Sequence, residues 1–159
     1  MLLEEQGDKK YNMATTNTAD LDGDGLVDLV IGDTSGRVFW SANIGSAKAP
    51  KFGPRAALKV GDQDVKVCHK SDAFALDFDG DGSIDLLVGD EAADVNYFRG
   101  KKDGTYEQGV SLFSGLAVDP RDGYAQAAAK LQPHRVVPGY RLRVTAVDWN
   151  RDDKLDLLI

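Results

Sequence analysis

Short apolar runs alternate along the chain with acidic, glycine-rich stretches. Three such runs are LVIGD at 29–33, LLVGD at 86–90 and LLI at 157–159. They are rich in leucine and β-branched residues and lack the 3.6-residue period of a helix, so each predicts a buried strand. The segments before two of the acidic stretches, DAFAL at 72–76 and RLRVTAV at 141–147, alternate roughly as strands do. The recurring unit is therefore strand, acidic loop, strand.

In two places the pattern continues past the second strand. RVFWSAN at 37–43 aligns without a gap with DVNYFR at 94–99, and each follows a short turn. We expect these segments to be third strands, joined to the second strands by tight hairpins. Fourth strands are expected within 51–60 and within 105–113. The chain is thus predicted to be all-β.

The acidic stretch keeps one register in all three copies. It is DLDGDGLVD at 20–28 (loop 1), DFDGDGSID at 77–85 (loop 2) and DWNRDDKLD at 148–156 (loop 3). Acidic residues occupy positions 1, 3, 5 and 9, with the amide Asn150 as the one replacement, and positions 2 and 8 are apolar. A pattern repeated in this way marks a repeat protein. The apolar positions predict that one side of each loop is anchored.

The crowded carboxylates predict a bound cation. Two carboxylates about 4 Å apart repel by roughly 4 kcal/mol at an effective dielectric constant near 20, and four converging groups multiply this repulsion. Oxygen ligands without His or Cys suit Ca²⁺, which accepts about six to eight oxygens in flexible geometry, better than Mg²⁺. Gly25 and Gly82 permit the positive φ that a short, ion-wrapping loop needs. Loop 3 has Asp153 at this position, so its site is expected to be weaker.

Of two other interpretations of the loops, the EF-hand is excluded and ordinary turn chemistry stays open. An EF-hand needs a Glu at the twelfth position and flanking helices, whereas that position holds Ile31, Val88 or Ile159. Asp and Gly also dominate ordinary turns that bind no metal. This second alternative is stronger for loop 3, where Arg151 and Lys154 intrude, than for loops 1 and 2.

The combined pattern DxDxDGxxDLLVG resembles the FG-GAP or VCBS repeat, found in the β-propeller of integrin α subunits and in many secreted bacterial proteins. The resemblance implies β-propeller-type blades of four antiparallel strands, with the acidic loop between the first two. It also implies Ca²⁺ ligands from four side chains and one backbone carbonyl in each loop. These are Asp20, Asp22, Asp24, Asp28 and the Leu26 carbonyl; Asp77, Asp79, Asp81, Asp85 and the Ser83 carbonyl; and Asp148, Asn150, Asp152, Asp156 and the Lys154 carbonyl.

The spacing of the loops divides residues 1–159 into about two and a half blades of one repeat region. We expect blade 1 at about 11–60, blade 2 at about 66–118, an insertion at about 119–140 and a partial blade 3 at about 141–159. Within the insertion, AQAAAKL is compatible with a short helix that ends before Pro133. A propeller needs roughly four to eight blades to close. We therefore expect a piece of a longer protein or, less favoured, an assembly of several copies.

The net charge of −7 is explained by the loops. They contain 12 of the 26 acidic residues; the other 14 acidic residues, set against all 19 basic residues of the chain, leave a balance of +5. The sequence has no basic stripe for nucleic acid and no apolar run long enough for a membrane span. Carboxylate sites in exposed loops suit the weak calcium affinities of extracellular modules. We expect an extracellular or cell-surface protein whose export signal lies outside this piece.

The sequence offers no convincing catalytic centre. Cys68 and His69 are adjacent in an extended segment, so their side chains point to opposite faces and cannot form a dyad. His134 is expected at the surface, and Asp90 and Glu91 are expected to form a turn. The chain is therefore predicted to be a calcium-binding, non-enzymatic module for extracellular protein or glycan binding and adhesion. The alternatives are a propeller segment of a secreted polysaccharide lyase or hydrolase and a structural spacer.

Overall fold

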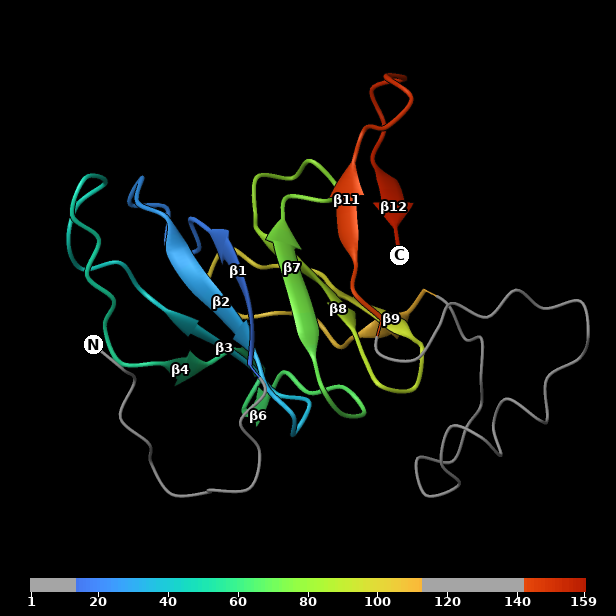
Figure 1. Cartoon of the computed structure of the whole chain (residues 1–159), viewed down its shortest axis with the longest axis horizontal. Helices are drawn as coiled ribbons and strands as arrows, with labels where there is room; N and C mark the ends of the chain where they lie inside the picture. The colour runs from blue at the N-terminus through green and yellow to red at the C-terminus, as the bar shows by residue number, and fades with distance from the viewer. Residues whose placement is uncertain (1–13, 113–141) are drawn as a thin grey trace, which may run out of the picture.

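A computed structural model describes residues 14–112 and 142–159, which form antiparallel sheets and contain no helix (Figure 1). The predicted all-β fold is confirmed, and no sheet in this part of the chain closes on itself. The insertion at about 119–140, with its proposed short helix, lies outside the described residues.

The first sheet has the order β1-β2-β3-β4. Its strands are β1 (Thr15–Ala19), β2 (Asp28–Gly32), β3 (Val38–Ser41) and β4 (Ala56–Ala57). Loop 1 connects β1 to β2, and the pair Ala19 and Asp28 closes the ladder next to it. The predicted third strand and the fourth strand within 51–60 are both present.

The second sheet repeats this arrangement, with β7, β8, β9 and β10 side by side. The strands are β7 (Asp72–Leu76), β8 (Asp85–Gly89), β9 (Val95–Phe98) and β10 (Val110–Ser111). The strand predicted at 72–76 has those bounds, and the fourth strand falls within the expected 105–113. Loops 1 and 2 thus occupy the same place in two successive four-stranded sheets.

Two further hairpins complete the described structure. β11 (Thr145–Val147) pairs with β12 (Asp156–Leu158) across loop 3. β5 (Lys59–Val60) pairs with β6 (Gln63–Asp64) around Gly61, whose φ is 57°. The β5–β6 hairpin was not predicted, because its two-residue strands are too short to show a period. All three acidic loops lie along one edge of the molecule, the upper edge in Figure 1.

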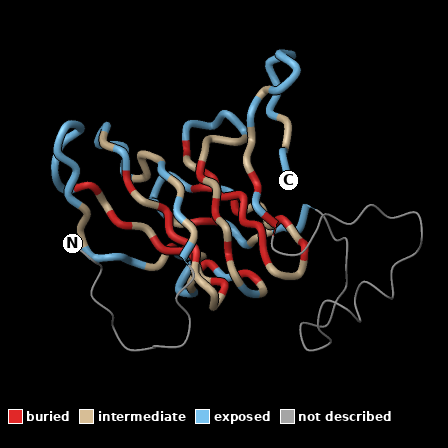
Figure 2. Tube along the Cα trace, viewed as in Figure 1, coloured by how far each residue is buried: buried red, intermediate tan, exposed pale blue. Residues whose placement is uncertain are grey.

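The hydrophobic core lies between successive sheets (Figure 2). β8 is buried along its whole length because Leu86 and Val88 face a core shared with the first sheet, whereas Leu87 faces a core shared with Leu142 and Val144. A strand covered on both faces loses the alternation of a half-exposed strand. The continuous apolar run LLV is the sequence consequence.

The prediction of burial is wrong for the third copy of the strand. Leu158 is 37% exposed and Ile159 is 48% exposed, since only β11 lies beside β12 in the described residues. The predicted apolar anchors of the loops also differ from one another. Leu21 packs against the first core cluster and Phe78 against the second, but Trp149 is 73% exposed and Val27 is 54% exposed.

Glycine at the end of the second strand lets the next unit approach closely. A Cβ on Gly32 would lie 2.1 Å from the Ser71 carbonyl oxygen, and a Cβ on Gly89 would lie 2.2 Å from the Leu142 carbonyl oxygen. The backbone hydrogen bond beside each glycine is also repeated: Ser71 N–H donates to the carbonyl oxygen of Asp33 at 3.1 Å, and Leu142 N–H donates to that of Asp90 at 3.2 Å. The same backbone contact therefore joins the first sheet to the segment before β7 and the second sheet to the segment before β11.

Candidate metal centres

Loops 1 and 2 each bring three carboxylates together. Oxygens of Asp20, Asp22 and Asp28 lie within 4.8 Å of one another, and so do those of Asp77, Asp79 and Asp85. These are the first, third and ninth positions of the repeat. The fifth-position residues Asp24 and Asp81 are outside these groups, and loop 3 shows no such group among the described residues.

Backbone N–H groups hold the first and ninth carboxylates in the same way in all three loops. The ninth-position carboxylate accepts the N–H of position 2, at 3.0 Å in loop 1, 3.0 Å in loop 2 and 2.9 Å in loop 3. The first-position carboxylate accepts the N–H of position 6, at 2.9, 2.9 and 3.0 Å. Hydrogen bonds within the protein therefore hold the conformation of all three loops.

The side chains at positions 3 and 5 accept backbone N–H groups of the same loop. The third-position side chain accepts the N–H of position 5 at 3.2, 3.2 and 3.0 Å in loops 1, 2 and 3. The fifth-position carboxylate accepts the N–H of position 7 at 2.7, 2.8 and 3.0 Å. Each carboxylate oxygen has two lone pairs, so an oxygen that accepts one N–H is still able to ligate a cation.

Positive φ at positions 4 and 6 turns each loop. Gly25 has φ 84° and Gly82 has φ 78°, as the glycine argument predicted. Loop 3 takes the same path with Arg151 at 63° and Asp153 at 64°. Non-glycine residues in this region cost roughly 1–2 kcal/mol each. Loop 3 therefore keeps the backbone of the repeat at a greater conformational cost.

The ninth-position carboxylates are buried and tie the loop to the end of the third strand. Asp28 is 1% exposed and accepts the Asn43 N–H at 2.8 Å; Asp85 is 0% exposed and accepts the Gly100 N–H at 2.6 Å. Tyr97 also donates its hydroxyl to Asp85 at 3.1 Å. Burial first, and Asp85 second, raise the pKa of Tyr97. Sequence reasoning missed these partners, although both N–H donors lie fifteen residues after the Asp.

The donor set of loop 2 fits a hard cation. Asp77 Oδ1 is buried and has no hydrogen-bond partner, although a buried polar oxygen is normally satisfied. Asp77 is the first residue of loop 2, and its carboxylate belongs to the same cluster as those of Asp79 and Asp85. An ion bound by the three carboxylates would satisfy this oxygen and compensate their charge.

Loop 2 also contacts cationic side chains. Arg99 Nε lies 2.7 Å from Asp79 Oδ2 and Arg99 Nη2 lies 2.9 Å from Asp81 Oδ2. Lys102 Nζ donates to the Asp81 carbonyl oxygen at 2.9 Å. Hydrogen bonds from Ser83, followed by those from Arg99, lower the pKa of Asp81, and Asp79 is the main cause that raises the pKa of Arg99. Sequence reasoning also missed these contacts.

The comparisons with known proteins agree with this geometry. A family model described as FG-GAP-like repeat matches residues 77–159, which is more than half of the chain. The chain belongs to the FG-GAP-like repeat family. No curated protein and no solved structure matches it. The matched segment includes loops 2 and 3, and loop 1 has the same hydrogen bonds although it precedes the match.

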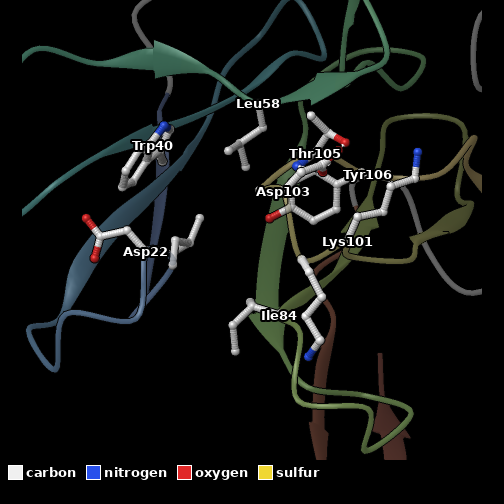
Figure 3. Close-up of a pocket in the computed structure, with 11 residues that line it drawn as sticks. Asp22, Trp40, Leu58, Ile84, Lys101, Asp103, Thr105 and Tyr106 are labelled. Atoms are coloured by element: carbon white, nitrogen blue, oxygen red, sulfur yellow. Dashed lines mark hydrogen bonds between the residues drawn. The ribbon is translucent and has the colours of Figure 1, made fainter.

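A pocket of about 310 Å³ lies between the first two sheets of this FG-GAP-like repeat chain (Figure 3). One side carries Trp40 and Leu58, and the other carries Ile84 and the turn at 101–106. The pocket adjoins both acidic loops. Asp22 of loop 1 lines it directly, and so does Lys102, which binds the backbone of loop 2.

The residues considered for catalysis have structural partners. His69 Nδ1 lies 3.7 Å from Glu91 Oε2, and burial is the main cause that raises the pKa of the Cys68 thiol, which is the opposite of nucleophile activation. Asp90 accepts the N–H groups of Ala92 and Asp94, so the prediction of a turn is confirmed. His134 lies outside the described residues. In the described part of the chain, no helix is long and apolar enough to cross a membrane.

Proposed function

We propose that this chain is a calcium-binding FG-GAP-like repeat module in which Ca²⁺ stabilises loops 1 and 2. The observation that carries the proposal is the repeated three-carboxylate cluster, whose ninth-position member is buried in both loops. The unpartnered Oδ1 of Asp77 supports it. The ligands would be the residues named above, and loop 3 would bind more weakly because it lacks both glycines and the carboxylate cluster.

Calcium would act mainly on stability. Asp28 and Asp85 each connect the start of a loop to the end of a third strand, so an ion at the cluster would hold three strands of one sheet in place. An ion that binds only the folded chain stabilises it by mass action, by about 2.7 kcal/mol per site at a concentration one hundred times the dissociation constant.

The module would serve extracellular binding. FG-GAP-like repeats are non-catalytic and typically extracellular. The pocket between the sheets combines the Trp40 ring with polar groups from Asp22, Lys101, Asp103 and Thr105. An aromatic face beside hydrogen-bonding groups suits a carbohydrate, which has both apolar faces and hydroxyls. Of the protein and glycan ligands expected, the pocket favours a glycan.

Thermal melting with and without EGTA tests the calcium proposal. We expect calcium at millimolar concentration to raise Tm by about 4–10 °C, given roughly 2–4 °C per kcal/mol for a chain of this size. Asp22→Asn should remove part of this increase. Asp33→Asn is the matched control: Asp33 organises the β2–β3 turn through Ser35 and Arg37, so its loss should lower Tm equally with and without calcium. A melt of the unsubstituted chain that EGTA leaves unchanged would refute the proposal.

A further inference from the structure

The two loops differ in one cationic side chain. Arg99 follows Asp85 by fourteen residues, and the residue at the same distance after Asp28 is Ala42. The Arg99 guanidinium contacts Asp79 and Asp81, the third and fifth positions of loop 2. In the described part of the chain, no Lys or Arg side chain forms an ion pair with a carboxylate of loop 1. Charge compensation is therefore unequal between two loops of nearly identical backbone.

We propose that Arg99 is a built-in counter-ion of loop 2, which makes that loop less dependent on calcium than loop 1 and lowers its calcium affinity. The inference rests on the proposed function. The two short contacts, at 2.7 and 2.9 Å, direct the guanidinium fork at two of the carboxylates that a metal ion would use. Arg99 and the ion would compete for the same negative charge.

Arg99 compensates only part of the negative charge of loop 2, so a metal ion would still be needed for the rest. Its contacts are with positions 3 and 5, whereas Asp77 Oδ1 at position 1 is buried without a partner, and Asp85 at position 9 is paired only with neutral donors. The carboxylates of Asp77 and Asp85 therefore still lack a cationic partner. Lys102 adds a second positive charge beside position 5, where it donates to the Asp81 carbonyl oxygen.

The side chain is also free to move aside. Arg99 is 45% exposed, and Asp79 and Asp81 are 31% exposed, so water competes for these contacts and each is a weak surface ion pair. Two such pairs correspond to a change of about tenfold in calcium affinity. The loop would shift from Arg99-bound to calcium-bound over the concentration range expected for an extracellular module.

Calorimetric calcium titration of the whole chain tests the proposal. Asp22→Asn is used as background, since it weakens loop 1 and leaves loop 2 as the main site. Adding Arg99→Ala should lower the dissociation constant of loop 2 about tenfold, and Arg99→Lys should lower it less. Arg55→Ala is the matched control, because it removes the same charge from a guanidinium that lies over the Phe39 ring, 4.7 Å from its centroid; it should leave the constant unchanged.

The outcomes separate the two proposals. A dissociation constant that Arg99→Ala leaves unchanged or raises, in a chain whose unsubstituted form binds calcium, overturns the role of Arg99 alone. An equal decrease with Arg55→Ala also overturns it, since the effect would then come from net charge. Absence of calcium binding in the unsubstituted chain and in Arg99→Ala refutes the calcium proposal itself.

Discussion

At the scale of single residues, the acidic loops behave as chemical units whose roles are set by position. The carboxylates at positions 1, 3, 5 and 9 each accept a backbone N–H, and in loops 1 and 2 three of the four also meet one another. The positions could be predicted from the sequence because the register repeats. The ligand assignments themselves stay predictions.

The contacts of Arg99 and Tyr97 could not be predicted from the loop pattern. Both residues lie on or just after β9, and their approach to loop 2 depends on how far the third strand returns along the second. The equivalent positions in the first sheet hold Ala42 and Trp40. The sequence shows that these aligned positions differ, but it does not show that Arg99 and Tyr97 reach loop 2, because that depends on the register of the sheet.

Trp40 is the residue on which the ligand proposal can be tested. Its indole lines the pocket between the two sheets (Figure 3), so Trp40→Ala removes an aromatic wall. We expect binding on a glycan array to fall about tenfold or more, because a buried aromatic contact is worth roughly 1–3 kcal/mol. Trp149→Ala, at a site 73% exposed and outside the pocket, is the control and should bind normally. Equal binding by both variants would exclude this pocket as the glycan site.

At the scale of elements, the strand predictions succeeded where the apolar pattern was strong. β7 was predicted with its observed bounds, and the third and fourth strands of both complete sheets fall within the expected segments. The β5–β6 hairpin escaped prediction, and β12 was wrongly expected to be buried. Burial of a strand depends on what lies beside it, which a local pattern does not contain.

The role of the glycines that end β2 and β8 likewise depends on neighbours that the local sequence does not reveal. Their sequence suggested only the end of a strand, whereas the structure shows that each admits the backbone of the next unit. Gly89→Ala should destabilise the chain by about 1–3 kcal/mol, since the added Cβ would overlap the Leu142 carbonyl. Chemical denaturation measures this change. Gly80→Ala is a useful contrast, because nothing lies within 4 Å of its Cβ and the cost comes from its φ of 76° alone.

An unchanged free energy of unfolding in Gly89→Ala would contradict the close approach, because Gly89 is not at positive φ and the overlap with Leu142 is the only cost expected there. Hydrogen exchange would locate the change: for Gly89→Ala it should appear in β11 and in the segment at 142–144 as well as in β8.

At the scale of the whole molecule, the described chain is a row of sheets whose cores lie between neighbours, with the acidic loops on one edge (Figures 1 and 2). The propeller-like repeat could be predicted because the same loop occurs three times. The division of charge between the loops could not, since it depends on side chains from the third strands. Calcium binding would then stabilise the row at the loop edge, one sheet at a time.

The central claim is that calcium occupies loops 1 and 2, and anomalous scattering from crystals grown at millimolar calcium tests it most directly. We predict peaks about 2.3–2.6 Å from carboxylate oxygens of Asp20, Asp22 and Asp28, and of Asp77, Asp79 and Asp85. The peak at loop 3 should be weaker. Well-ordered loops 1 and 2 without such peaks would contradict the claim.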